Sequence, residues 1–400
     1  MLSIEEAREV LLAHSKVIKE TEQIPVLEAI GRVLAEDACA KVDQPPFARS
    51  PLDGYALKGE ETVGASRDNP KSFQVIGKIY AGQVFLGKVE SGQAVRLMTG
   101  APIPEGADTV IRQEWSDYGE DQVQIYACSK AYQDYCPQGE DYRAGDCLLK
   151  KNQVIDGAAA AILASLGYDL VKVYRQPKIA VISTGDEVAA PGEELLPGKI
   201  YDSNLYYICG RLKEKGLPAF YAKHCSDTAE EVAAEIKALA GKADLVITTG
   251  GVSVGEKDIM HELVKILGAE QLFWRVKIKP GAPTLAAYYE DMPIVALSGN
   301  PFGAAANFEL LVRSMIAKMT GNSIWQVPRK KMTMQSNFYK GGGARRFLRA
   351  RREGHKVWLR DGNHASGAMA SMIGSNCFVE IDPSMEQGAR IGDEVWVHLL

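Results

Sequence analysis

Residues 178–184 read KIAVIST, a run of apolar and β-branched residues that ends in a glycine-containing acidic turn. Three similar runs follow at 219–224, 244–249 and 293–298. The stretches between these runs have the hydrophobic spacing of amphipathic helices. Alternation of strands and helices at this spacing predicts a mainly parallel sheet that helices cover on both faces.

The helices between these strands carry recognisable start signals. The segment DTAEEVAAEIKALAG begins with Asp227 as the expected N-cap and has Glu230 at the third helical position, which is the pattern of a capping box. A further helix is expected after Gly255. The last should begin at Pro301, because proline is favoured in the first turn of a helix.

The whole chain is predicted to be a multidomain α/β protein. Its central α/β domain with the mainly parallel sheet is expected at 177–325. Residues 51–144 have short alternating apolar runs separated by Gly, Pro and Asp, which indicates a β-rich inserted domain. The flanking stretches 1–50 and 145–176 are expected to form one elongated, discontinuous N-terminal domain. Strand-like runs in 326–400 predict a small C-terminal β-barrel.

Composition narrows the class of protein. The 400 residues are 46% hydrophobic and 24% charged, which is typical of a multidomain globular chain. The net charge of −5, with both signs interleaved, argues against nucleic acid as a partner. The start lacks the pattern of a signal peptide and no apolar run reaches the roughly 20 residues of a membrane span, so a cytoplasmic protein without a membrane partner is expected. The seven cysteines form no C-x-x-C pair and are expected to be free thiols.

Three of the predicted strands end in turns of small residues. In an open parallel sheet, ligands bind outside the carboxyl ends of the strands, where backbone N–H groups can approach a phosphate. Any one such turn can exist for tight geometry alone, but three in one sheet favour a phosphate site. The chain lacks G-x-x-x-x-G-K-[ST] and lacks G-x-G-x-x-G after a strand, which disfavours a Walker-type NTPase and a dinucleotide fold. The residues expected at the ligand are Ser183, Thr184, Gly185, Gly250, Gly251, Ser253, Ser298, Gly299, Asn300 and Pro301.

Acidic residues accompany these turns. Glu187 and Asp258 lie at or just past strand ends, and Asp53 and Asp141 lie in turns of the β-rich region. Mg²⁺ takes one or two carboxylates together with phosphate oxygens and waters, so the pattern suits a metal-bridged phosphate ligand. For Asp227 the capping role suffices, although its place at a strand end leaves a ligand role open.

Basic residues occur in two strand-like runs. Arg275, Lys277 and Lys279 alternate, so they should share one strand face, which would hold an oxyanion or else be a solvated edge. In the run 345–352, Arg349 should share its face with Arg345 and Arg351, and one face of this strand is expected to be free for an anion. None of the six His residues lies in a Ser or Cys motif, so nucleophilic catalysis has little support.

Eight ordered motifs give the chain a family resemblance that covers essentially its whole length. It resembles the molybdopterin molybdenumtransferases, the MoeA family that includes the E domain of gephyrin. The motifs are PLDGYA (51–56), MTGAPIPEGADTVI (98–111), GEDYRAGD (139–146), STGDE (183–187), YDSN (201–204), TTGGVSVGEKD (248–258), KPGAP (279–283) and SGNP (298–301).

The resemblance implies an elongated homodimer of four-domain chains. It implies an enzyme that receives adenylated molybdopterin, inserts molybdate with Mg²⁺ and releases molybdenum cofactor and AMP. The implied protein partners are a molybdopterin adenylyltransferase and the acceptor molybdoenzymes.

The resemblance also assigns roles to particular residues. Asp53 and Thr99 of one subunit would cover the pocket of the other subunit, and Asp227 would lie near metal and pterin phosphate. Lys279, Pro280, Arg349 and Ser366 would lie near ligand or molybdate. The implied catalytic residues are Asp53, Thr99, Asp141, Glu187 and Asp258, of which Glu187 and Asp258 would hold the metal.

Four positions depart from the family pattern. Leu52 stands where Met is common, which conserves volume, and Gln138 replaces an arginine. Ser298 replaces a proline and Ala282 a lysine, so the molybdate contacts can differ. Two alternatives stay open beside the insertase: a non-catalytic molybdopterin-binding scaffold, as the gephyrin resemblance implies, and an insertase for another oxyanion such as tungstate, which Ser298 and Ala282 suggest.

Overall fold

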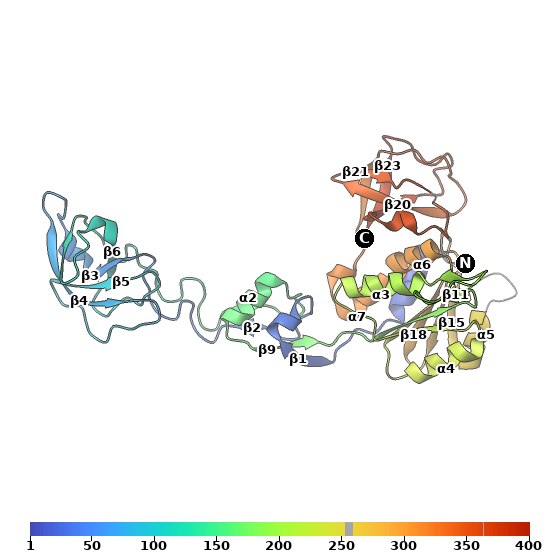
Figure 1. Cartoon of the computed structure of the whole chain (residues 1–400), viewed down its shortest axis with the longest axis horizontal. Coiled ribbons are helices and arrows are strands. Elements are labelled where there is room, and N and C mark those ends of the chain that lie inside the picture. The colour runs from blue at the N-terminus through green and yellow to red at the C-terminus, as the bar shows by residue number, and fades with distance from the viewer. Residues whose placement is uncertain (253–258, 363) are drawn as a thin grey trace. The chain divides into compact units, whose positions relative to one another are not determined.

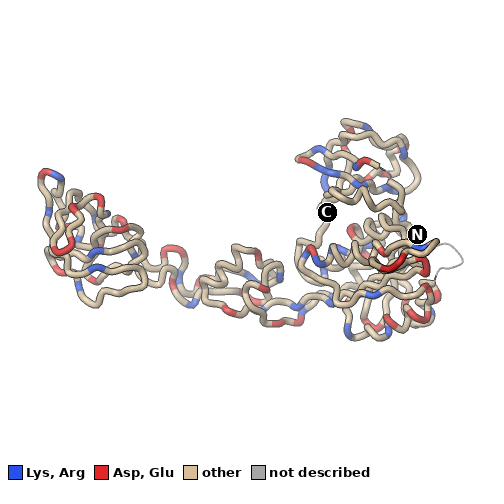
Figure 2. The backbone as a smooth tube through the Cα atoms, viewed as in Figure 1, with Lys and Arg blue, Asp and Glu red and all other residues tan. Residues whose placement is uncertain are grey.

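The computed structural model describes residues 1–252, 259–362 and 364–400. The chain forms two compact units (Figure 1). The first unit consists of Met1–Ala35, Asn152–Asp156 and Leu170–Leu400, and the second consists of Glu36–Lys151 and Gly157–Asp169. Lysine, arginine and acidic residues are interspersed along both units (Figure 2).

A six-stranded sheet forms the centre of the first unit. Its strand order is β13-β10-β14-β18-β17-β15. The first four strands are parallel, and β17 and β15 continue the sheet in antiparallel pairing. The mainly parallel sheet is therefore confirmed. The strands are β10 (Ile179–Thr184), β13 (Tyr221–Cys225), β14 (Leu245–Thr249), β15 (Glu270–Trp274), β17 (Leu285–Tyr289) and β18 (Met292–Leu297).

Helices cover both faces of this sheet. In β10, Ile179 and Val181 belong to one hydrophobic core, and Ala180 and Ile182 belong to the other, as the two-residue period of a strand requires. The first core also receives residues from α1 (Ile4–Ala13), α3 (Asn204–Glu214), α6 (Pro301–Asn307) and α7 (Arg313–Thr320). The second core receives α4 (Ala229–Leu239) and α5 (Ile259–Leu267).

The helix starts agree with the sequence at Pro301 and disagree at Asp227. Helix α6 begins at Pro301 with Asn300 as its N-cap, as predicted. Helix α5 follows Gly255, whose own position lies outside the described residues. Helix α4 begins at Ala229 with Thr228 as N-cap and no side-chain capping bond, so the predicted capping box is wrong.

The N-terminal helix α1 packs on the central sheet. Its residues Ile4, Ala7 and Leu11 are buried in the first core. The first unit also contains two short strand pairs: β1 (Thr21–Pro25) with β9 (Leu170–Tyr174), and β11 (Val188–Ala189) with β12 (Ile200–Tyr201).

The C-terminal strands form the predicted barrel. They follow the order β20-β21-β19-β23-β22, and an additional pairing of β20 with β22 closes the five strands into a barrel. The short strand β16 (Ile278–Lys279) pairs with β20 and so attaches the chain after β15 to the barrel. The barrel strands are β19 (Arg329–Met334), β20 (Arg345–Glu353), β21 (Lys356–Leu359), β22 (Cys377–Ile381) and β23 (Glu394–Leu399).

The second unit contains a five-stranded sheet of order β6-β3-β5-β4-β7, together with the strand pair β2-β8 and helix α2. The β-rich character expected for the inserted segment is therefore present. The sheet and its neighbours are β2 (Ala38–Cys39), β3 (Gly54–Leu57), β4 (Lys71–Ile79), β5 (Gln93–Leu97), β6 (Thr109–Arg112), β7 (Gln122–Ile125), β8 (Cys147–Leu149) and α2 (Gly157–Ser165).

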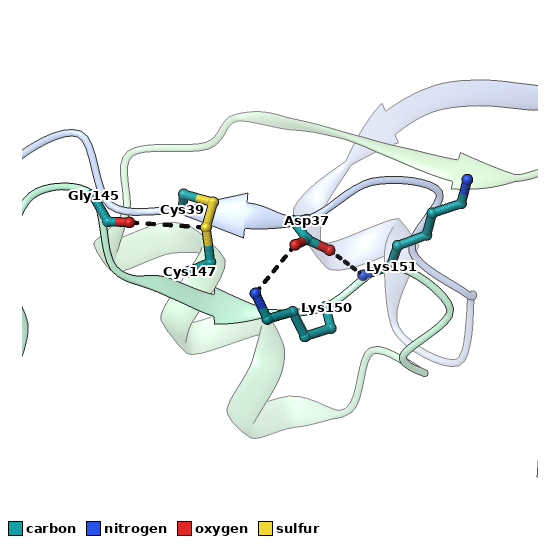
Figure 3. The surroundings of a disulfide bond; sticks show 6 residues. All are labelled: Asp37, Cys39, Gly145, Cys147, Lys150 and Lys151. Atoms are coloured by element: carbon teal, nitrogen blue, oxygen red, sulfur yellow. Dashed lines mark hydrogen bonds and ion pairs between the residues drawn. A yellow bond between two sulfur atoms is a disulfide. The ribbon is translucent and has the colours of Figure 1, made fainter.

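A disulfide bond joins Cys39 to Cys147 in the second unit (Figure 3). The two cysteines are register partners in the antiparallel pair of β2 and β8. The expectation that all seven cysteines are free is therefore wrong for this pair. The two residues are 108 positions apart, and only the strand pairing brings them together. Within the described residues, no helix is long and apolar enough to cross a bilayer.

Candidate functional site

The ends of β10, β14 and β18 meet at one edge of the central sheet, here named the carboxyl edge. Gly250 has a φ of +94°, and a Cβ built on it would lie 2.3 Å from the carbonyl oxygen of Thr184. A Cβ on Gly299 would lie 3.4 Å from the Cα of Gly250. Only glycine at position 250 permits this approach. The three predicted turns are thus brought together.

The acids of the first turn lie beside this contact. Glu187 is exposed, and a Cβ on Gly185 would lie 2.9 Å from its Oε2, so the carboxylate folds over the glycine. Asp186 Oδ1 accepts a hydrogen bond of 3.1 Å from the backbone N–H of Asp227. Asp227 therefore belongs to this acidic group and not to the first turn of α4. Ser253 and Asp258, which were also predicted here, lie outside the described residues.

One histidine lies at the carboxyl edge although no motif indicated it. His224 is the register partner of Ser183 in the pairing of β10 with β13, and its Nδ1 lies 3.1 Å from Ser183 Oγ. No sequence signal indicates this pair, because the contact depends on which strands are neighbours in the sheet. Ser183 is only 2% exposed, so its hydroxyl is not presented as a nucleophile.

A buried asparagine holds the loop that contains Lys279 and Pro280. Asn307 Nδ2 donates to the carbonyl oxygen of Gly281 at 2.9 Å and to Thr284 Oγ1 at 2.6 Å. Gly281 has a φ of +93°, and a Cβ there would lie 2.4 Å from Asn307 Oδ1. The glycine of the KPGAP motif is therefore required for this packing. Lys279 itself is exposed.

The predicted basic face of Arg275, Lys277 and Lys279 is wrong. Arg275 has a φ of +71° and lies between β15 and β16, so the three residues do not belong to one strand. The guanidinium of Arg275 lies over the ring of Trp274, with 5.6 Å to the ring centroid. The left-handed conformation of Arg275 interrupts the strand, so the side chains at 275, 277 and 279 do not share one strand face as the prediction required.

Arg349 lies in the interior of the structure. Its guanidinium donates to the carbonyl oxygens of Ala365, at 3.3 Å, and Ala368, and lies 3.9 Å from the ring centroid of Phe302. Burial lowers the pKa of Arg349 to about 10. The next residue along the same loop, Ser366, accepts a 2.8 Å hydrogen bond from the backbone N–H of Phe302 through its carbonyl oxygen. Arg349 and Ser366 thus lie beside the Pro301 turn.

The face of β20 that carries Arg345, Arg349 and Arg351 is not free for an anion. Arg345 forms ion pairs with Glu5 and with Glu380, the latter at 3.3 Å, and Arg351 pairs with Glu353 at 2.9 Å. Arg349, between them on the same face, is 0% exposed. The arginines of this face are therefore already engaged with carboxylates or carbonyl oxygens.

The YDSN motif contains two residues at the carboxyl edge, Asp202 and Asn204, that were not predicted as ligands. Asp202 Oδ1 accepts from the backbone N–H of Leu205 at 3.0 Å, and Asn204 Nδ2 donates to the carbonyl oxygen of Gly299 at 2.8 Å. Their other oxygens, Asp202 Oδ2 and Asn204 Oδ1, are buried and have no hydrogen-bond partner among the described residues. The same holds for Thr249 Oγ1 at the end of β14.

The predicted residues of the second unit form two separate places within that unit. Asp53 Oδ1 accepts hydrogen bonds from the backbone N–H of Thr99 at 2.7 Å and from its hydroxyl at 2.8 Å, and these bonds lower the pKa of Asp53. Asp141 is exposed, and its backbone N–H donates to the carbonyl oxygen of Gln44 at 2.9 Å. Asp53 and Thr99 are thus one pair, and Asp141 belongs to a different turn.

Two cavities of the first unit lie away from the carboxyl edge. One of about 270 Å³ is lined by Lys178, Asp244 and Pro293, which precede or begin β10, β14 and β18. Another of about 400 Å³ lies beside Arg8 and Leu310. Neither cavity is lined by a residue of the carboxyl edge, and the candidate site is defined by the turns and acids of that edge.

Three family descriptions match the chain in succession. Residues 2–167 match the MoeA N-terminal region (domain I and II), residues 180–318 a probable molybdopterin binding domain, and residues 331–400 the MoeA C-terminal region (domain IV). The chain belongs to the MoeA family.

Relatives of this MoeA-family chain match it over nearly its full length. The molybdopterin molybdenumtransferase of Staphylococcus epidermidis is 35% identical over 401 residues, covering 100% of the chain and 95% of the relative. The enzyme of the same name from Staphylococcus aureus strain COL is 35% identical, covering 96% and 93%. A crystal structure of the molybdopterin biosynthesis MoeA protein from Pyrococcus horikoshii superimposes with a TM-score of 0.84 at 32% identity, covering 100% and 99% of the two chains.

Proposed function

We propose that this chain is a molybdenum insertase of molybdenum cofactor biosynthesis. It takes adenylated molybdopterin and molybdate, and it releases molybdenum cofactor and AMP with Mg²⁺. The observation that carries the proposal is the meeting of three glycine turns and their acids at the carboxyl edge, within the part that matches a probable molybdopterin binding domain. Full-length relatives named molybdopterin molybdenumtransferase support the reaction.

In this proposal the glycines bring the ligand's phosphates close to the backbone. Gly185, Gly250 and Gly251 all have positive φ, which glycine adopts readily, so these turns can keep the tight backbone course that would direct N–H groups toward a phosphate. Thr184 packs against Gly250 and so forms part of the proposed phosphate site. The turns therefore orient the substrate and exclude water from one side of it.

Glu187 and Asp258 would hold Mg²⁺. The ion would offset the charge of the phosphate that leaves with AMP. The described residues contain no group of three or more His, Cys, Asp or Glu side chains gathered as a metal site. Mg²⁺ suits such a place, since it commonly takes one or two carboxylates and completes its shell with phosphate oxygens and waters.

Molybdate would bind where the KPGAP loop and the barrel loop approach the SGNP turn. Lys279 would supply the exposed cation, and Ser366 a hydroxyl donor. Arg349 would act as a positioning residue, because its guanidinium is bonded to the carbonyl oxygens of the loop that contains Ser366. Pro280 and Ser298 shape the two turns, and Ser298 Oγ accepts from the backbone N–H of Asn300 at 3.3 Å.

We also propose that the working enzyme is a homodimer of four-domain chains in the cytoplasm. Asp53 and Thr99 of one copy would cover the site of the other, with Asp141 contributing from the same unit. The bond from Thr99 keeps the Asp53 carboxylate in one orientation, which supports a role in contacting substrate. A molybdopterin adenylyltransferase would supply the substrate, and acceptor molybdoenzymes would take the product.

The test is direct turnover by the purified chain. Adenylated molybdopterin, molybdate and Mg²⁺ are mixed with the protein, AMP is measured by chromatography, and cofactor is measured by reconstitution of an apo-molybdoenzyme. We expect both products, and loss of both with EDTA. Binding of adenylated molybdopterin without either product would instead establish the scaffold alternative. Replacing molybdate by tungstate at equal concentration in the same assay decides which oxyanion is preferred.

A further inference from the structure

Asp202 is a buried carboxylate for which the folded chain provides only half of the expected partners. It is 8% exposed, and Oδ1 accepts from the backbone N–H of Leu205 near the start of α3. Oδ2 is buried without a hydrogen-bond partner among the described residues. A buried carboxylate oxygen without a donor is costly, so it indicates a donor that arrives with a ligand.

Asn204 presents a second acceptor two residues further along. Its Nδ2 is committed to the carbonyl oxygen of Gly299 at 2.8 Å, which fixes the orientation of the amide group. Its Oδ1 is therefore the atom left over, and it is buried without a partner among the described residues. Gly299 packs against Gly250, so this amide is attached directly to the carboxyl edge.

Both orphaned atoms are acceptors, and this decides the chemistry of what they receive. A phosphate or molybdate oxygen would be repelled by Asp202, so an anion is excluded. A Mg²⁺ ion usually keeps several waters in an octahedral shell, which a carboxylate that is 8% exposed does not accommodate. An uncharged flat group that presents N–H donors offers each atom a partner and carries no hydration shell of its own.

We infer that Asp202 Oδ2 and Asn204 Oδ1 recognise the pterin by accepting hydrogen bonds from its 2-amino and ring N–H groups. This rests on the proposed function, because molybdopterin supplies the pterin. The aminopyrimidinone edge of a pterin carries those two donors side by side, and the chain offers one acceptor for each. The pair selects pterins over pteridines that have an oxo group at position 2, since the oxo group places an acceptor against a carboxylate.

The experiment compares two fluorescent probes, 6-hydroxymethylpterin and 6-hydroxymethyllumazine, by quenching titrations with the full chain. The lumazine differs at position 2, where oxo replaces amino. We expect the wild-type chain to prefer the pterin by about ten-fold or more, because a charge-assisted hydrogen bond is lost with the lumazine. Asp202→Asn keeps the oxygen that accepts from Leu205 and places an N–H₂ donor at Oδ2. It should reduce this preference about ten-fold or reverse it.

Two further variants separate recognition from folding. Asn204→Ala should also lower the pterin preference, because one acceptor is removed. Ser203→Ala lies in the same turn, where the Ser203 side chain makes no capping bond, and should leave the preference unchanged. A folding defect would weaken the binding of both probes together. A reversed preference instead requires that Asp202 and Asn204 distinguish the donor pattern of the two probes.

The outcomes also keep the inference apart from the proposed function. A pterin preference that is the same in wild type and Asp202→Asn overturns the inference, and so does a wild-type chain that forms cofactor but prefers neither probe. Weakened Mg²⁺ binding in Asp202→Asn with an unchanged probe preference would make the pair a cation site and would equally overturn it. A chain that prefers the pterin but forms neither AMP nor cofactor would leave the inference standing and remove the proposed function.

Discussion

Substitution of Glu187 tests the acidic part of the site, because the Glu187 carboxylate lies against Gly185 at the end of β10. Glu187→Gln keeps the shape and removes the charge that would hold Mg²⁺. We expect AMP release to fall about ten-fold or more, with the loss partly recovered at high Mg²⁺ concentration. Glu194→Gln, a change of another exposed acid in the segment that follows, serves as the control. Wild-type turnover in Glu187→Gln would remove this residue from the metal site.

Arg349 tests the molybdate contacts. Its buried guanidinium holds the Ala365 and Ala368 carbonyl oxygens, so Arg349→Ala should release the loop that carries Ser366. We expect the molybdate concentration for half-maximal cofactor formation to rise about ten-fold or more, while the adenylated substrate binds as before. Ala282→Lys adds a cation to the neighbouring loop and should lower that concentration. An Arg349→Ala curve that overlays the wild-type curve would place molybdate elsewhere.

At the scale of the elements, a buried acid on one barrel strand contacts side chains of three others, and one of these side chains also reaches the N-terminal helix. Glu380 on β22 is 2% exposed and accepts from Arg329 at 2.9 Å through both oxygens, and it lies 2.7 Å from His398 Nε2. Arg345 contacts both Glu380 and Glu5 of α1. The barrel is therefore held to the rest of the first unit by the Arg345–Glu5 ion pair with α1 as well as by the pairing of β16 with β20.

Glu380→Gln should destabilise this barrel by about 2 to 4 kcal/mol, somewhat less than for a fully buried pair because Arg329 is partly exposed. Burial raises the pKa of Glu380, but the bonds from His398 and Arg329 outweigh it, so the pKa is lowered. The stabilisation is thus complete above the ordinary glutamate pKa and is lost as pH falls through the lowered pKa. Hydrogen exchange of β22 and β23 in increasing urea, at pH 7 and at pH 3, measures it. As a control, Glu353→Gln removes the exposed ion pair with Arg351 on β20 and should change the hydrogen exchange of β22 and β23 little.

The elements that the sequence predicted well depend on local signals. The strand KIAVIST and the helix start at Pro301 follow from residue type and spacing, which act within a few residues. The predicted face of Arg275, Lys277 and Lys279 failed because one left-handed residue breaks the strand, and arginine carries no mark of that conformation. Asp227 failed as a cap because its backbone N–H is drawn to Asp186, 41 positions away.

The candidate site shows the same limit. The turns at Gly250 and Gly299 were found because glycine and strand ends are visible in a sequence. The orphaned oxygen of Asp202 and the Ser183–His224 contact were not found, since both depend on which groups the folded chain leaves or brings nearby. Burial of Arg349 likewise depends on its contacts with Phe302 of α6 and with the loop at Ala365, which no short stretch around Arg349 encodes.

For the whole molecule, the proposed homodimer makes a prediction about mixed chains. If Asp53 of one copy covers the site that contains Glu187 of the other, Asp53→Ala and Glu187→Ala chains carry complementary lesions. Mixed dimers should regain about one intact site out of two, because both lesions can fall in the same pocket. The measurement is AMP release after co-refolding at several mixing ratios. Absence of recovery at every ratio would mean that each chain builds its site alone.

The bond between Cys39 and Cys147 turns most of the second unit into a closed covalent loop. A single protease cut between these two residues opens the loop but does not divide the molecule. We expect such nicked protein to run as one band on a non-reducing gel and as two bands after dithiothreitol. A cut in the loop that includes Pro191, outside the ring, should give two bands under both conditions. Comparison of the two gels therefore reports whether Cys39 and Cys147 are joined. Cys39→Ser should abolish the difference between the gels.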